Sequence, residues 1–176
     1  EYVTQSLIVV NEPVVKKRNV WTKEWKYEKE SDKIEERKLQ GLSPESDAII
    51  RNIREKIIPE QNREKIASRQ EIHRQGTKMY EARKKSLEVK GQFGPSYITV
   101  SNEEIQSLVK EFSGTGIIKY NSQGNWDSKE IITTNDKIIG VVVDNRNGNS
   151  AETSVFKIHY AKDGIHIVPD YPSKKR

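Results

Sequence analysis

The stretch KIHYAKDGIHIVP, residues 157–169, decides how the C-terminal half of the chain folds. Apolar and polar residues alternate on both sides of Asp163-Gly164, a dipeptide that signals a tight turn because glycine tolerates a positive φ. The pattern predicts a β-hairpin with this dipeptide as its turn. Side chains alternate between the two faces of a strand. One face is therefore predicted to be apolar core, made of Phe156, Ile158, Tyr160, Ile165 and Ile167.

The other face of the predicted hairpin carries two of the chain's three histidines, His159 and His166. With this turn, Ala161 lies opposite His166 and His159 lies opposite Val168. The two histidines are then diagonal neighbours, roughly 7–8 Å apart at the backbone. Imidazoles titrate near neutral pH, so such a pair can act as acid and base on one phosphodiester. The alternative is a pair of ordinary surface histidines, and the spacing alone leaves both interpretations open.

Composition excludes several classes of protein. Of the 176 residues, 33% are hydrophobic and 32% are charged, which predicts a compact part and an elongated, solvated part. The chain has no cysteine, so disulfides, zinc thiolates and a cysteine nucleophile are excluded. No apolar run approaches the ~18 residues of a membrane span, and no secretory signal is visible. The histidines lack the spacing and the carboxylates of a metal site, so neither metal nor cofactor is predicted.

The positive charge of the chain is concentrated in one segment. The net charge is +5, and nearly all the excess lies between Arg69 and Lys90. A localised basic stripe suits nucleic-acid phosphates better than an evenly basic surface would, although a solvated helix face is an equal alternative. The predicted nucleic-acid-binding residues are Arg69, Arg74, Lys78, Arg83, Lys84 and Lys85, with Lys157 and Lys162 on the hairpin.

The N-terminal third is predicted to be a charged, largely helical extension, residues 1–65. Ser43-Pro44 has the form of a helix start, and isoleucines at spacings of three and four follow it. Trp21 and Trp25 share a helix face, either for docking on another chain or for packing on the protein's own core. The extension is interpreted as a stalk, an oligomerisation element or a docking element.

The predicted domain after the extension spans residues 66–172, and a basic tail follows at 173–176. Helical runs are expected over 60–75 and 78–89, and a third helix starts at Ser101 with Glu104 at capping-box spacing. Short strands follow up to the hairpin. The fold class is therefore α+β, a charged helical extension and then a small domain of helix plus antiparallel β-meander.

Four elements of this domain resemble, in their order, the polymorphic toxin type 50 family. They are residues 69–80 (RQEIHRQGTKMY), 112–116 (FSGTG), 126–130 (WDSKE) and the hairpin 158–169. The resemblance covers roughly residues 66–172 and implies the RNase-toxin-like fold of the barnase and colicin-nuclease group. The chain departs from the family pattern in the order Ile72-His73, and at Asp163 and Ile165.

The family occurs in bacterial toxins and at the C-termini of phage minor head proteins. With the charged extension, this resemblance favours a phage minor head or ejection protein that resides in the virion and enters the host cytoplasm on infection. Such a protein would bind nucleic acid, with packaged DNA favoured over RNA. The other expected partners are portal or capsid proteins and a second copy of the chain. A membrane is not expected as a partner.

Two alternatives remain. One is a metal-independent endoribonuclease toxin domain in which His159 and His166 are the acid–base pair, in either order, and His73 is the third member. In it, Lys157 and Lys162 hold the phosphate, and Glu130 and Thr153 are weaker candidates. The other is a purely structural capsid component.

Overall fold

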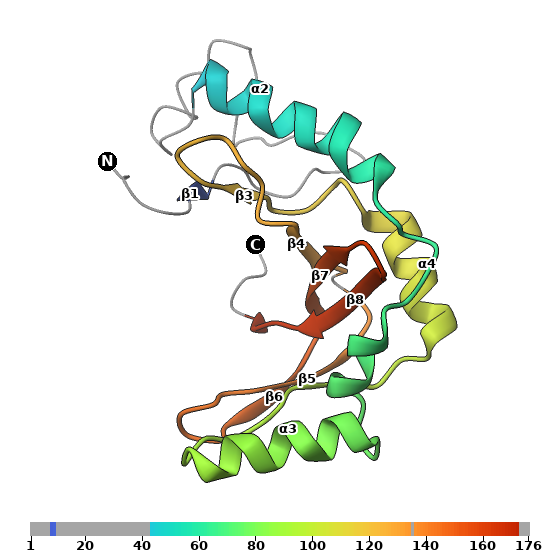
Figure 1. The fold of residues 1–176 in the computed structure, drawn as a ribbon, viewed down its shortest axis with the longest axis vertical. Coiled ribbons are helices and arrows are strands. Elements are labelled where there is room, and N and C mark those ends of the chain that lie inside the picture. The colour runs from blue at the N-terminus through green and yellow to red at the C-terminus, as the bar shows by residue number, and fades with distance from the viewer. Residues whose placement is uncertain (1–7, 10–42, 135, 173–176) are drawn as a thin grey trace. The chain divides into compact units, whose positions relative to one another are not determined.

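The structure is a computed structural model that describes residues 8–9, 43–134 and 136–172. These residues form two compact units. The first contains the described residues up to Glu60 and the segment Gly114–Asp127, and the second contains Gln61–Ser113 and the residues from Ser128 onward. Figure 1 traces their helices and antiparallel strands, which confirm the predicted α+β class. The predicted division at residues 65 and 172 stays a prediction.

The first unit is built on the helix that Ser43 was predicted to start. Helix α2 (Pro44–Asn52) begins where the Ser43 hydroxyl accepts a hydrogen bond of 3.1 Å from the Ser46 N–H. A π-helical turn, η1 (Ile53–Ile57), and a 3-10 turn, η2 (Ile58–Glu60), extend it. Three isoleucines of the predicted stripe are buried, namely Ile50, Ile53 and Ile58.

Two hydrogen bonds attach the second segment of this unit to its helix. Arg54 donates to the Gly116 carbonyl at 2.6 Å, and the Tyr120 hydroxyl donates to the Ser46 hydroxyl at 2.6 Å. The short strand β3 (Lys119–Tyr120) pairs with β1 (Ile8–Val9). Trp21 and Trp25, the predicted docking pair, lie outside the described residues.

The second unit holds two three-stranded antiparallel sheets. One has the order β2 (Tyr97–Ile98), β5 (Gly140–Val143), β6 (Ser150–Thr153), and the other has β4 (Lys129–Thr133), β7 (Val155–Ala161), β8 (Gly164–Pro169). Only Ser154 separates β6 from β7, so the chain bends there from one sheet into the other. The predicted apolar face of the hairpin is confirmed as core, with Phe156, Ile158, Ile165 and Ile167 fully buried.

Two capped helices flank these sheets. Helix α3 (Lys78–Val89) begins at Thr77, whose hydroxyl accepts from the Tyr80 N–H at 3.0 Å. Tyr80 meets Tyr97 of β2 edge to face, with ring centroids 6.4 Å apart. Helix α4 (Asn102–Phe112) has the predicted capping box between Ser101 and Glu104. In the described residues no helix is long and apolar enough to cross a membrane.

The helix predicted over residues 60–75 is wrong. The chain runs extended and then forms a 3-10 helix, η3 (Ser68–His73). The extended part pairs with the outer edge of β8: the Ile165 N–H donates to the Lys65 carbonyl, and the Ala67 N–H donates to the Ile165 carbonyl, both at 2.8 Å. This ladder satisfies backbone groups of an edge strand, and that need overrides the weak local helix preference.

The predicted register of the hairpin is also wrong, by two residues. Ala161 pairs with Gly164 and His159 pairs with His166, so Lys162-Asp163 forms the turn and Gly164 belongs to β8. The glycine is needed there because its φ is +127° and a Cβ atom would lie 2.5 Å from the Lys65 carbonyl oxygen. A two-residue slip leaves every side chain on its predicted face, but it brings the two histidines directly opposite each other.

Candidate active site

All three histidines of the chain converge on one side of the β4–β7–β8 sheet. The rings of His159 and His166 have centroids 4.6 Å apart and planes tilted by 30°. The ring of His73 stacks nearly parallel to that of His166, with centroids 6.2 Å apart. The structure thus joins the three residues predicted as catalytic into one cluster, with His166 in contact with both others.

His73 enters the cluster from the end of η3, and a second group orients its ring. Its Nδ1 atom lies 2.9 Å from the Ser96 carbonyl oxygen. Because a carbonyl can only accept, Nδ1 carries the hydrogen in this bond, and Nε2 is left with the lone pair of a neutral imidazole. A base oriented by a hydrogen-bond partner is typical of sites that transfer protons.

Burial keeps the hairpin pair neutral. It lowers the pKa of His159 to about 3, with further contributions from His166 and from Lys129 and Lys157. It lowers the pKa of His166 to about 4, with help from His73 and Arg69, while the Asp163 carboxylate acts in the opposite direction. At neutral pH both imidazoles are therefore uncharged in the absence of a bound anion.

The pKa of His73 is lowered as well. Burial is the main cause, and Arg83 and Arg69 add to it, while the hydrogen bond to Ser96 raises the pKa. The whole cluster is consequently a set of neutral imidazoles in a positive field.

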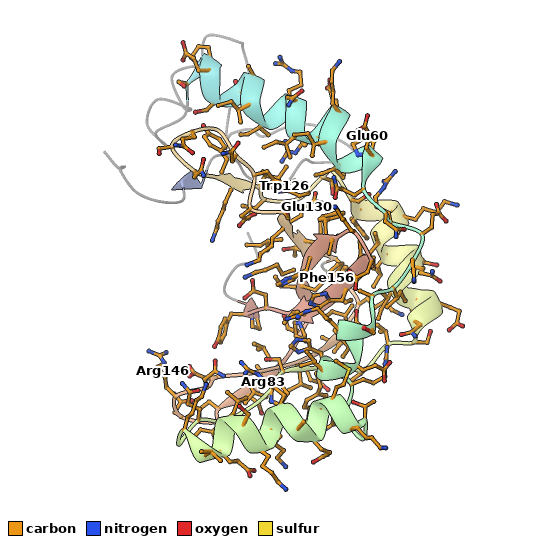
Figure 2. The ribbon with its side chains drawn as sticks, in the orientation of Figure 1. Glu60, Arg83, Trp126, Glu130, Arg146 and Phe156 are labelled. Atoms are coloured by element: carbon orange, nitrogen blue, oxygen red, sulfur yellow. The ribbon has the colours of Figure 1, made fainter. Side chains whose placement is uncertain are left out.

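Four basic side chains create that field, and three were predicted. Arg69, Arg83 and Lys157, which were predicted to bind nucleic acid, act electrostatically on the imidazoles. Figure 2 labels Arg83 on the side of α3 turned toward the strands. Sequence reasoning missed Lys129 at this site, because its place follows from the β4–β7 register, which pairs Lys129 with His159.

In the described part of the chain, the other five predicted basic residues are not among the groups that act on the histidines. Lys78, Lys84 and Lys85 are exposed on α3, and Lys162 is exposed in the hairpin turn. Arg74 donates to the Asn102 side chain at 2.8 Å. Within the described residues, none of these five is among the groups that shift the pKa of an imidazole.

Gln70 is a residue of the site that the sequence did not reveal. It is only 1% exposed, and its side-chain amide makes two hydrogen bonds to the backbone of Ile167. Its Nε2 donates to the Ile167 carbonyl at 2.9 Å, and its Oε1 accepts from the Ile167 N–H at 2.7 Å. Its one sequence signal was its place in the segment 69–80.

The opposite face of the same sheet holds Glu130, which is fully buried. The Tyr160 hydroxyl donates to the Glu130 carboxylate at 2.7 Å, and burial, followed by the charge of Glu130, raises the pKa of Tyr160. Arg63 donates to the Ser113 hydroxyl at 2.8 Å, and Ser113 is hydrogen-bonded to Tyr160. Figure 2 labels Glu130 and Phe156 among these strands. Glu130 therefore serves the core and not the histidine face.

Thr153, the other weaker candidate, is buried as well. Its hydroxyl donates to the Asp170 carbonyl at 2.8 Å. Among the described side chains, no group of three or more histidine, aspartate or glutamate residues has the arrangement needed to hold a metal ion. Neutral imidazoles beside cationic side chains are groups that can transfer protons and attract a phosphate.

Comparison with known proteins agrees with the predicted resemblance. The family model for the bacterial toxin 50 domain matches residues 65–169, more than half of the chain, and it includes all three histidines. No curated protein and no solved structure matches the chain. On the family match, the chain belongs to the bacterial toxin 50 family.

Proposed function

We propose that this protein is a metal-independent endoribonuclease whose active site is the cluster of His73, His166 and His159. The observation that carries the proposal is an imidazole with a fixed tautomer beside a pair of imidazoles in a positive field. Cleavage of RNA without a metal needs a base, an acid and cations on the phosphate, and the cluster offers a candidate for each.

The reaction is an internal transesterification. His73 Nε2 takes the proton of the 2′-OH, and the 2′-oxygen attacks the phosphorus atom. As the new P–O2′ bond forms, the P–O5′ bond breaks, and the acid gives a proton to the leaving 5′-oxygen. The products are a 2′,3′-cyclic phosphate and a free 5′-OH. His73, which the sequence suggested as the third member, is the base because the Ser96 carbonyl fixes its tautomer.

The acid is the hairpin pair, His159 and His166. Both are neutral in the free protein, because they are buried beside each other and beside basic residues. A bound phosphodiester brings a negative charge that favours the charged imidazolium, so it raises the pKa of the pair. Because the two rings interact strongly, the bound state has one proton on the pair, and this proton is not assigned to either histidine alone.

The four basic side chains hold the phosphate. Lys129 and Lys157 lie on the His159 side of the cluster, and Arg69 and Arg83 lie on the His73 side. Positive groups fixed at the site of developing charge stabilise the transition state more than they do in water. The cations therefore contribute both to binding and to the chemical step.

Cleavage of end-labelled single-stranded RNA by the full chain in EDTA tests the proposal. We expect fragments ending in 2′,3′-cyclic phosphate, and no cut where a single 2′-deoxynucleotide replaces the cleaved one. His73→Gln removes the base and is expected to slow cleavage about 10²–10⁴-fold. Lys110→Ala, on the exposed surface of α4, is the matched control and keeps the wild-type rate. Cleavage that persists in His73→Gln, or that requires a divalent metal, contradicts the proposal.

A second function rests on the same positive field. Neutral imidazoles among four cations can also bind phosphates without cutting them. In this case the protein is a phage minor head component that binds packaged DNA in the virion, meets portal or capsid proteins and enters the host cytoplasm. Intact duplex DNA shifted on a native gel at low salt and released at high salt, with RNA left uncut, supports this second function.

A further inference from the structure

The outer edge of β8 is closed by a segment that is only partly a strand. β8 is the last strand of its sheet, so the backbone groups of Ile165 and Ile167 need partners other than β7. Lys65 and Ala67 supply the two hydrogen bonds to Ile165, as a parallel bridge. The chain then turns away into η3, and its backbone no longer runs beside Ile167.

At that point the Gln70 side chain supplies the hydrogen bonds to β8 in place of the backbone. A primary amide has the same donor and acceptor as a peptide group, and Gln70 uses both on the backbone of Ile167. The side chain thus continues the ladder by one step after the backbone has left it. Both bonds are buried, so their loss leaves a buried N–H and a buried C=O without partners.

The bonds also determine where the catalytic groups lie. Ile167 follows His166 on β8, and Gln70 stands three residues before His73 and next to Arg69. The amide therefore ties the 3-10 helix that carries His73 and Arg69 to the strand that carries His166. On its other side, His73 is held by the Ser96 carbonyl.

We propose that Gln70 is a positioning residue that sets the spacing of His73 and Arg69 from His166. The kinetic test of this proposal rests on the proposed ribonuclease function, whereas its test by NMR titration does not. The role demands this side chain. Asparagine is one methylene too short, methionine fills the space with neither donor nor acceptor, and an ionised glutamate repels the Ile167 carbonyl.

NMR titration of the three imidazoles in the full chain tests the spacing without any substrate. In Gln70→Met we expect the pKa of His166 to rise from about 4 toward its ordinary value, because His73 and Arg69, which help to lower it, move away. Val109→Ala, a truncation in the core of α4, is the control with a matched loss of Tm, and its imidazoles titrate as in the wild type. An unchanged His166 titration in Gln70→Met, or an equal shift in Val109→Ala, overturns the proposal.

Kinetics supply the second arm. A displacement of a catalytic group by about 1 Å can cost on the order of 100-fold in rate, and we expect such a loss for Gln70→Met but not for Val109→Ala. Adding Gln70→Met to His73→Gln should cause a smaller further loss than Gln70→Met causes alone, since the part that acts through His73 is already lost and only the displacement of Arg69 remains. A full additional loss in the double variant overturns the positioning role. If the wild type cuts no RNA, the proposed function fails. The NMR titration alone then tests the positioning role of Gln70.

Gln70→Glu covers the case in which Gln70→Met does not fold. A protonated carboxyl group keeps one donor and one acceptor, whereas the carboxylate has no donor. Below the pKa of the introduced glutamate, we expect the rings of His73 and His166 to keep their wild-type contact. Above that pKa we expect the contact to be lost. Nuclear Overhauser effects between the two rings measure the contact. A contact that is independent of pH overturns the proposal.

Discussion

The two faces of the β4–β7–β8 sheet carry polar groups from neighbouring residues of the same strands. His159 and Tyr160 are adjacent on β7, and Lys129 and Glu130 are adjacent on β4. On one face the Glu130–Tyr160 pair is buried and hydrogen-bonded, and it belongs to the core. On the other, His166 is buried and His159 is half-buried, and cationic side chains act on both imidazoles. The two faces thus place polar groups in different electrostatic surroundings, a hydrogen-bonded pair on one face and cations on the other.

Burial acts on both faces, and it keeps Tyr160 on one face and the histidines on the other uncharged. It raises the pKa of Tyr160, which stays a hydrogen-bond donor, and it lowers the pKa values of the histidines, which stay bases. On the core face the Tyr160 hydroxyl and the Glu130 carboxylate satisfy each other. On the histidine face the proposed function has an arriving phosphate favour protonated imidazoles, so we expect the two faces to respond differently to substitution and to pH.

The largest expected effect is the loss of cleavage in His166→Asn. This ring contacts both other imidazoles, so its removal disrupts the whole cluster. We expect RNA cleavage to fall about 10²–10⁴-fold, with a nearly unchanged Tm, measured by fragment release and by thermal melting. A parallel loss of Tm and activity would place His166 with the core groups of the other face.

Gly164→Ala should disturb both faces through their shared register. The added Cβ meets the Lys65 carbonyl oxygen, and φ at this position is +127°. We expect the free energy of unfolding to fall by about 3 kcal/mol or more, measured by denaturant titration. Gly91→Ala, also at positive φ but with open space around its Cβ, is the control for backbone strain alone. Equal losses in the two variants would show that the contact with Lys65 is unimportant.

Tyr160→Phe should affect stability without affecting chemistry. It removes the hydroxyl that donates to the buried Glu130 carboxylate. We expect a loss of about 1–3 kcal/mol in the free energy of unfolding, with the cleavage rate per folded molecule unchanged. The measurement is a pair of experiments below the Tm of the variant, one of unfolding and one of initial rate. A selective loss of rate would mean that the core face takes part in catalysis.

A further expected effect is on the pH dependence of stability. The histidines titrate at about 6.5 when unfolded, and His159 and His166 at about 3 and 4 when folded. The unfolded state therefore binds more protons between these values, so stability is fully present above pH 6.5 and falls as the pH drops toward 4. Thermal melting from pH 7 to pH 5 should show a decline in Tm that is shallower in His159→Asn. Identical declines would contradict the lowered pKa of His159.

Local signals were enough to predict much of the fold. The starts of α2 and α4 followed from Ser43 and from the Ser101–Glu104 box, because capping involves residues three apart. The core face of the hairpin followed from alternation, which survives a two-residue slip. The family followed from the same segment and its neighbours.

Tertiary structure alone decided how the candidate site is assembled. His159 pairs directly with His166 in a register that local pattern did not predict, and Ser96 and Gln70 are bonded to the segment that carries His73. Lys129 reached the cluster through pairing with a strand thirty residues away. A sequence pattern reports periodicity and caps because these are local. It does not report which distant backbone closes an edge strand, and in this protein that closure brings the three histidines together.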